Sequence, residues 1–449
     1  EIELPSVKPG IPPSCSEATI KSVLLIVMVS STVAEPTHTS PSKTPISSPI
    51  SKLESKILKE TINKHFWEVF LIRNYSLLWL SSFLSMLSTQ IRIISTGFIL
   101  YEITGSGLSL GMLGVIQLFF QLPSILFGGV FADYLKRTTL ITITQLIGTL
   151  VVGLLSYFAF TDSLTAWHIY VATAFLSVNS TIGGPARSAL TANLVPKNQL
   201  IHAVAANTAT MQIGSVIAPI IFGILTVIVG TALPLFIGSI AAFISALACF
   251  MIKTNSVPSQ KNKMSPIKNI LEGFIYVKNH PILPGLYLLD IGVTVVSFYR
   301  QILPLIADRL YKGGAVAVSL LTAFNSVGAI IGSFLVVFLT KIKSKGKLVL
   351  AATMLYGILL ILFGLSSGLF LGAIIISLLG SADGVGMTVR QAIVQLTCPD
   401  NLRGRAVSLH SVAAMTANNV GHFEIGVASD LIGARNAIII GGIISCFVV

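Results

Sequence analysis

Charged residues are scarce in this sequence. Asp, Glu, Lys and Arg together make up 10% of its 449 residues, whereas soluble proteins carry about 25%. Hydrophobic residues make up 53%, and the mean hydropathy is +0.86. A water-soluble fold of this length needs more polar surface than the sequence supplies. The composition therefore excludes a soluble globular protein and predicts an all-α membrane protein that crosses the bilayer several times.

Acidic residues are rarer than basic ones, 17 against 29, which gives a formal net charge of +12. The basic residues form no compact patch with interleaved aromatics, so the excess does not indicate nucleic-acid binding. The four cysteines are scattered and form no CxxC pair, which leaves no basis for a disulfide framework or a metal site. The sequence also lacks a Walker A loop and the GxSxG and HExxH motifs. We therefore expect no enzyme chemistry, no direct use of ATP and no cofactor.

One segment of the chain occurs twice. Residues 183–196 (GGPARSALTANLVP) and 386–399 (GMTVRQAIVQLTCP) align with Arg187 opposite Arg390, an offset of 203 residues, and Ala203 and Ala406 continue the alignment. A repeat of this size in so apolar a chain indicates two similar bundles of membrane helices. Paired bundles of this kind enclose a site and rock around it, which is how transporters work.

Apolar runs divide the chain into twelve predicted spans in two halves. We expect 1–60 to be a disordered tail rich in Ser, Pro and Thr, 61–252 an N-terminal six-helix half, 253–281 a cytoplasmic linker, and 282–449 a C-terminal six-helix half. The predicted spans are 75–101, 106–132, 138–160, 165–186, 203–229, 231–252, 282–305, 315–340, 348–366, 369–389, 406–429 and 436–449. The last falls short of the roughly 20 residues a span needs, so we expect it to be truncated. A short apolar run at 23–29 alternatively fits a signal peptide.

Basic residues set the expected orientation. Lys and Arg gather in the loops after the second, fourth, sixth, eighth and tenth predicted spans, whereas the opposite loops hold Arg309, Lys312 and Arg435. The positive-inside rule then places the N-terminus and the central linker in the cytoplasm. Residues 52–73 are basic and amphipathic, which is typical of a helix lying on the cytoplasmic membrane face.

A glycine-rich loop follows the second predicted span. Gly128 and Gly129 allow close helix approach, and Asp133 and Arg137 stand on a tight turn at the membrane edge, where an acid can form a latch with a neighbouring helix end. This loop resembles the signature loop of the major facilitator superfamily. The usual glycine before the arginine is Lys136 here, a replacement similar to the branch that contains the enterobactin exporter and the macrolide efflux proteins. Residues 74–80, 101–106 and 184–187 resemble the same branch, and residues 403–405 fit the matching loop of the second half. The resemblance implies a multi-pass protein of the bacterial inner membrane.

The fifth predicted span contains small residues around a proline. Gly214, Ala218, Pro219 and Gly223 give the helix a smooth face, and the proline frees a backbone carbonyl and bends the helix. The segment resembles the antiporter motif of drug–proton exchangers, with Ala218 where that motif has glycine. The resemblance favours export, and the alternative is ordinary packing of small residues.

Polar residues form stripes on predicted spans one, four and seven, the spans that line the central cavity in the superfamily. Spacings of three and four residues place each set on one helical face, which lipid would not tolerate. We therefore expect the stripes to line a cavity, and the alternative is hydrogen bonding between helices. The predicted cavity residues are Ser85, Ser88, Arg92, Ser177, Ser180, Thr294, Ser297 and Gln301.

Two acids within the predicted spans are candidates for proton coupling. Asp290 lies inside the seventh predicted span and Asp383 inside the tenth, where an unpaired charge costs several kcal/mol. Asp290 is expected to exchange a proton for substrate. The alternatives are a static Arg92–Asp290 ion pair that holds the halves together and, for Asp383, a polar site that bends its helix.

The sequence thus predicts a proton-driven secondary transporter that exports a small amphiphilic molecule by alternating access. Its partners are the substrate, protons and the lipid bilayer, and we expect a monomer that binds no nucleic acid. One alternative is a facilitator of a metabolite or lysolipid that uses no protons. Another is a membrane receptor or scaffold that transports nothing.

Overall fold

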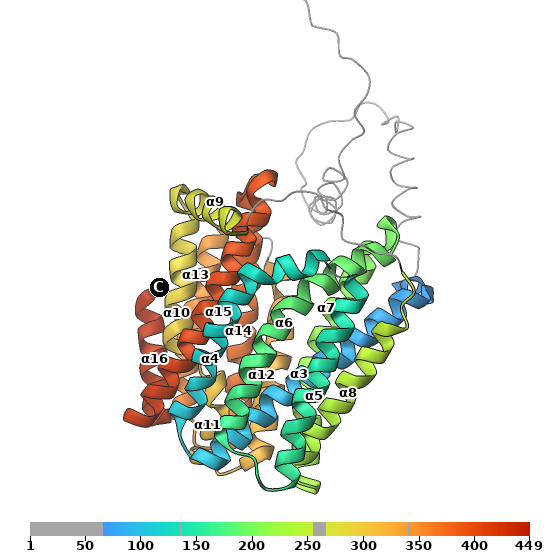
Figure 1. Ribbon diagram of the computed structural model, residues 1–449. Helices are drawn as coiled ribbons and strands as arrows, with labels where there is room; N and C mark the ends of the chain where they lie inside the picture. Colours follow the sequence, from blue (N-terminus) through green and yellow to red (C-terminus); the bar gives the residue numbers. More distant parts are fainter. Residues whose placement is uncertain (1–65, 135, 255–265, 340–341, 343) are drawn as a thin grey trace, which may run out of the picture. The chain divides into compact units, whose positions relative to one another are not determined.

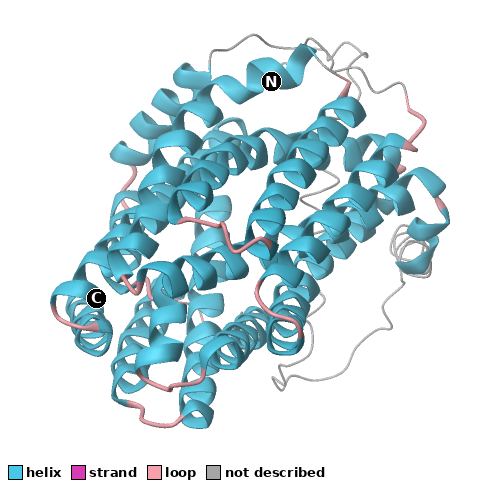
Figure 2. Ribbon diagram, turned by 60° about the horizontal axis from the view of Figure 1, so that its bottom comes forward, coloured by secondary structure: helices cyan, strands magenta, loops and turns pink. Residues whose placement is uncertain are grey.

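The computed structural model describes residues 66–134, 136–254, 266–339, 342 and 344–449. The predicted tail at 1–60, with the apolar run at 23–29, lies outside the described residues. The described part of the chain is helical and contains no strand (Figure 2). The all-α prediction is confirmed for these residues.

Each of the six predicted spans of the N-terminal half coincides with one helix (Figure 1). A short 3₁₀ helix, η1 (Phe66–Leu71), precedes them, and a second, η2 (Lys197–Gln199), joins the fourth helix to the fifth. The six helices are α3 (Arg73–Thr104), α4 (Gly107–Tyr134), α5 (Arg137–Phe160), α6 (Ala166–Leu194), α7 (Leu200–Ile228) and α8 (Ala232–Phe250).

The second part of the chain begins with α9 (Pro266–Asn279), which lies within the predicted linker and packs against α15 and α10 (Figure 1). The seventh predicted span is divided into three pieces, and the remaining spans are single helices. These elements are α10 (Leu283–Ser297), η3 (Arg300–Ile302), α11 (Leu303–Arg309), α12 (Gly314–Leu339), α13 (Lys345–Leu365), α14 (Leu369–Thr397), α15 (Asp400–Leu431) and α16 (Ala434–Val448).

Nine helical stretches in the described part of the chain are long and apolar enough to cross a membrane, with α10 to α11 taken as one stretch. α6 and α15 are long but more polar, and α16 is apolar but short. Large apolar side chains face outward, such as Phe338 and Phe370, which are 77% and 76% exposed. Such a surface is stable against lipid and unstable against water.

The span predicted at 282–305 matches a single candidate membrane span, Leu283–Arg309, but its helix is interrupted. α10 ends at Ser297, the next residue Phe298 has φ −82° and ψ 96°, and the helical path resumes at Arg300. The apolar run continues through this break, so hydrophobicity does not reveal it. Pro304 in the first turn of α11 is the local signal, because proline is favoured where a helix begins.

Two predicted helix ends are too early. Spans four and ten were expected to end at 186 and 389, but α6 continues to Leu194 and α14 to Thr397. Arg187 and Arg390 therefore lie inside helices and not in the loops that their charge suggested. Both arginines belong to the repeated segment, so the same error occurs once in each half.

The sequence repeat has a counterpart in the hydrogen bonds. The Tyr75 hydroxyl donates to the carbonyl oxygen of Ala203 at 3.0 Å, and the Tyr287 hydroxyl donates to that of Ala406 at 2.9 Å. Ala203 and Ala406 are equivalent in the repeat. The two tyrosines therefore make the same bond, from α3 to α7 in one half and from α10 to α15 in the other.

Polar bonds join the two halves at one end of the bundle. We call it the Gly105 end, and it carries the loops at 104–107, 160–166, 228–232, 309–314, 365–369 and 431–434. The Asp430 carboxylate accepts bonds from the backbone N–H groups of Gly107 at 2.7 Å and Leu108 at 2.9 Å. The Ser106 hydroxyl donates to the same carboxylate at 2.6 Å. Asp430 of α15 thus caps the N-terminus of α4, where the helix dipole favours an anion.

Further bonds support this junction. Arg309 donates to the carbonyl oxygen of Gly105 at 2.9 Å, and the Tyr101 hydroxyl donates to Asp308 at 2.9 Å. The helices also approach closely, because a Cβ atom added to Gly426 would lie 2.6 Å from the carbonyl oxygen of Gly107. The two halves are therefore closely joined at the Gly105 end.

Candidate functional site

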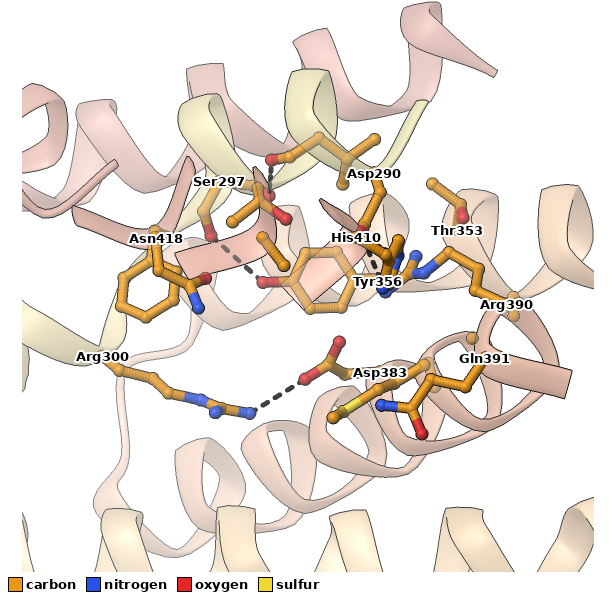
Figure 3. Close-up of a pocket in the computed structure, with 18 of the residues that line it drawn as sticks. Asp290, Ser297, Arg300, Thr353, Tyr356, Asp383, Arg390, Gln391, His410 and Asn418 are labelled. Carbon is orange, nitrogen blue, oxygen red and sulfur yellow. Dashed lines mark hydrogen bonds and ion pairs between the residues drawn. The ribbon is translucent and has the colours of Figure 1, made fainter. Parts of the chain in front are cut away.

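A polar cavity of about 440 Å³ lies inside the C-terminal half, between α10, η3, α13, α14 and α15 (Figure 3). We call it the C-terminal cavity. Its charged and ionisable lining residues are Asp290, Arg300, Tyr299, Tyr356, Asp383, Arg390 and His410. This concentration of charge in a chain with 10% charged residues marks the cavity as the first candidate site.

Asp290 is the centre of the deeper charge cluster. One carboxylate oxygen lies 3.0 Å from an Nη atom of Arg390, and the other lies 3.1 Å from Nε2 of His410. The side chains of Asp290 and Arg390 are only 9% and 11% exposed. Because the three residues belong to α10, α14 and α15, the charge of a single carboxylate links three helices. The Arg92–Asp290 pair that the sequence suggested as an alternative is not formed here, since Asp290 pairs with Arg390 and His410.

A second ion pair lies nearer the opening of the cavity. Arg300 and Asp383 are 2.9 Å apart, with side chains 43% and 33% exposed, and Figure 3 shows the pair spanning the cavity. Arg300 is the first residue of η3, so the break after α10 supplies this cation. The Tyr356 hydroxyl donates to the carbonyl oxygen of Ser297 at 3.1 Å, where the broken helix leaves that oxygen without a partner in the next turn.

Most of the site residues predicted for this half line the C-terminal cavity. Asp290, Thr294, Ser297 and Asp383 all do so. Gln301 does not, because the helix break separates it from the face of α10, and its side chain donates to the carbonyl oxygen of Leu110 in α4 at 3.2 Å.

Sequence reasoning missed five ionisable residues of this cavity: Tyr299, Arg300, Tyr356, Arg390 and His410. Arg390 could have been predicted from the sequence, because it lies in the repeated segment. Its charge was instead interpreted as that of a residue in a cytoplasmic loop. His410 gives no signal, because its role depends on where α15 packs.

A smaller cavity of about 180 Å³ lies inside the N-terminal half, between α3, α5, α6 and α8. We call it the N-terminal cavity. The predicted residues Ser85, Ser88, Arg92 and Ser180 line it, together with Arg187, which sequence reasoning missed. Ser177 does not, and its hydroxyl donates to the carbonyl oxygen of Thr173 at 2.6 Å. This bond lies within α6, so for Ser177 it is not the hydrogen bond between helices that the alternative described.

The glycine-rich signature loop falls at the junction of α4 and α5. The side chains of the motif residues up to Asp133 lie outside the described side chains, so the predicted latch stays a prediction. Arg137, the first residue of α5, donates to the carbonyl oxygen of Ala189 in α6 at 3.2 Å. This bond ties the start of α5 to the neighbouring helix.

The antiporter-like segment lies in α7, and all four of its predicted residues are buried. A Cβ atom added to Gly214 would lie 3.0 Å from the side chain of Met86 in α3, and one added to Gly223 would overlap Ser319 in α12. The small residues therefore let α7 contact a helix of its own half and a helix of the other half. The packing role is observed, and the antiporter role stays a prediction.

Polytopic helical bundles with a polar cavity in each of two repeated halves are typical of secondary transporters. Solved transporters share the fold. The nucleoside transporter NupG superposes with a TM-score of 0.64 at 15% identity, covering 84% of this chain and 97% of that one. A bacterial homolog of the human lysosomal transporter Spinster, in an inward-facing and unoccupied conformation, gives a TM-score of 0.66 at 14% identity, covering 84% and 95%. At such identities the likeness shows the fold, which is that of the major facilitator superfamily.

The chain belongs to the Transmembrane secretion effector family, which residues 66–449 match. Among its relatives is the enterobactin exporter EntS of Escherichia coli O1:K1, 27% identical over 304 residues, which are 67% of this chain and 72% of that protein. EntS of Shigella boydii serotype 18 matches at the same identity and coverage. The resemblance inferred from the motifs is confirmed: the protein is a multi-pass membrane transporter of a bacterial exporter family, and its relatives are transporters, not enzymes.

Proposed function

We propose that the protein exports a small amphiphilic molecule by alternating access and that protons moving in the opposite direction drive the export. The observation that carries this proposal is the cluster of Asp290, Arg390 and His410. It places a single buried carboxylate between two basic groups on two other helices. A change in the charge of that carboxylate alters the contacts of three helices at once.

The coupling follows from the cost of buried charge. With Asp290 ionised, its attraction to Arg390 and His410 offsets the cost of holding these groups away from water. When Asp290 takes up a proton, the guanidinium loses its counter-ion and α10 loses its tie to α14 and α15. The protonated state therefore favours a different arrangement of these helices. Substrate binding and protonation of Asp290 then favour different arrangements of the same cavity, as antiport requires.

The direction of opening is part of the proposal. The halves are joined at the Gly105 end by Asp430, Arg309 and Tyr101. The positive-inside rule assigns that end to the outside of the bacterial inner membrane and the central linker to the cytoplasm. The arrangement described here then corresponds to the state that receives substrate from the cytoplasm.

Since one chain supplies both cavities, we propose that the transporter acts as a monomer.

The identity of the cargo is suggested by the relatives, whose names describe them as enterobactin exporters. We propose that the cargo is a small amphiphilic molecule of the same kind. A cavity volume of about 440 Å³ is within the range of small-molecule sites.

The test measures uptake into everted vesicles that carry a pH gradient, with enterobactin and a macrolide as probes. Substitution Asp290→Asn should abolish gradient-driven uptake while leaving the protein folded, as checked by its yield and its elution from a sizing column. Asp162→Asn is the matched control, because Asp162 is an exposed carboxylate in the turn after α5. Wild-type rates in Asp290→Asn would remove Asp290 from the coupling. Uptake that ignores collapse of the pH gradient would favour the proton-independent facilitator.

A further inference from the structure

The N-terminal cavity contains two positive charges that nothing in the described part of the chain neutralises. Arg92 of α3 and Arg187 of α6 both line it, and none of the described residues that line it is acidic. Neither guanidinium forms a hydrogen bond or ion pair with a described residue. One terminal nitrogen of Arg187 is fully buried and has no partner there. A cavity of about 180 Å³ thus contains two guanidinium groups that can donate hydrogen bonds, and no described carboxylate accepts them.

The other half of the molecule shows what satisfies such an arginine. Arg390, the repeat equivalent of Arg187, is paired with Asp290 at 3.0 Å. The offset between Tyr75 and Tyr287, which make equivalent bonds, is 212 residues, and it places Leu78 opposite Asp290. Leu78 is buried and apolar. The arginine is therefore present in both halves, and its counter-ion is present in only one.

The cost of unpaired buried charge applies to the N-terminal cavity and not to the C-terminal cavity. Buried charges within a membrane protein are costly unless an opposite charge accompanies them. The C-terminal cavity balances Arg300 and Arg390 with Asp383 and Asp290. In the N-terminal cavity, only an anion from outside the described part of the chain can neutralise Arg92 and Arg187. Its other lining groups include the hydroxyls of Ser85, Ser88 and Thr89 and the side-chain amide of Gln145, which can donate to the same anion.

We propose that the N-terminal cavity is an anion subsite, in which Arg92 and Arg187 bind an oxyanion group of the exported molecule. This inference rests on the proposed export function. Guanidinium groups bind carboxylates with two parallel N–H donors, so a carboxylate fits the site. The cavity volume of about 180 Å³ admits such a group and not a whole amphiphile, so the remainder of the cargo lies outside this cavity. The substrate class is therefore an anionic amphiphile.

The experiment measures binding without any gradient, on the full chain in nanodiscs of neutral phosphatidylcholine. The probes are 2,3-dihydroxybenzoate and benzoate, with benzamide as the neutral analogue, and the readout is a calorimetric Kd. We expect both anions to bind and benzamide to fail. Arg92→Gln or Arg187→Gln should weaken binding about 10- to 100-fold, the effect of losing one charged hydrogen-bond partner. Arg92→Lys and Arg187→Lys should retain part of the affinity, because they keep the charge.

Lys347→Gln is the matched control for the lost positive charge, because Lys347 is exposed at the start of α13 and lines neither cavity. Equal anion binding in the wild type and both Gln variants would overturn the proposal, and so would equal binding of benzamide. Nanodiscs with phosphatidylglycerol provide a further arm. If anionic lipid weakens benzoate binding in the wild type, a lipid headgroup is the occupant and the assignment to substrate is overturned.

Failure of this inference is distinguishable from failure of the proposed transport cycle. Asp290→Asn should keep the anion affinity of the wild type, because Asp290 does not line the N-terminal cavity. If Asp290→Asn transports normally, the proton-coupling proposal fails and the anion subsite stands. If anion binding is absent while the pH gradient still drives export, the subsite fails and the proposed function stands.

Discussion

Asp430 provides the most specific test of how the two halves separate. Its carboxylate accepts two backbone N–H bonds and one hydroxyl bond at the N-terminus of α4. These bonds exist only while the Gly105 end is closed, since Asp430 and Gly107 belong to different halves. Asp430→Ala removes all three and leaves the cavities unchanged. The substitution should therefore shift the balance between the closed and open states without altering the cargo site.

The magnitude follows from helix capping. Loss of an N-cap acceptor costs about 1 kcal/mol, with a range of roughly 0.5 to 2. Asp430 is exposed, and water replaces part of what is lost, so we take about 1 kcal/mol. That energy corresponds to about a fivefold increase in the ratio of open to closed molecules. Asp430→Asn should give a smaller shift, because the amide oxygen still accepts a bond but carries no charge.

The assay is a spin-label distance across the Gly105 end. Cysteines placed at the exposed positions Ser163 and Ser367 report on the two halves, in a background where the native cysteines are replaced. Asp430→Ala should increase the population at the longer distance. Glu102→Ala is the control, because Glu102 is an exposed acid on α3 that also lies at the Gly105 end. An unchanged distance distribution in Asp430→Ala, or an equal change in the control, would refute the latch.

Two further predictions concern the stability of the halves. Tyr75→Phe and Tyr287→Phe should each lower the free energy of unfolding by about 1 kcal/mol, since each removes one buried hydrogen bond. Thermal unfolding in detergent measures this, and an effect in only one half would contradict the structural repeat. Arg390→Gln should destabilise the protein by about 3 to 5 kcal/mol, because it leaves Asp290 buried with His410 alone. Adding Asp290→Asn should recover part of that loss, and strictly additive effects would contradict the pairing.

The helices were predictable because their signal is local. A helix in lipid must be apolar over most of its length, so each predicted span overlies a helical stretch. Helix ends were less predictable where polar residues enter the helix. Arg187 and Arg390 carry the charge of a loop residue, yet each lies inside a helix because its guanidinium faces a cavity. Charge alone does not distinguish a cytoplasmic loop from a helix that lines a polar cavity.

The candidate site was only partly predictable, for a similar reason. Asp290 and Asp383 stand out because an acid in an apolar run is costly. Their partners cannot be found from spacing, because Arg390 and His410 approach Asp290 only through the packing of α10, α14 and α15. Arg300 reaches Asp383 only because the chain leaves its helical path at Phe298.

The central claim is that the Gly105 end must open during every transport cycle. Ser106 and Asp430 bond across this end at 2.6 Å. Cysteines at these two positions, in a background without native cysteines, can be bridged with a short methanethiosulfonate cross-linker in everted vesicles. The account predicts that the bridge stops gradient-driven uptake, that reductant restores it, and that neither single-cysteine variant responds. Continued uptake by fully bridged protein would contradict alternating access in this molecule.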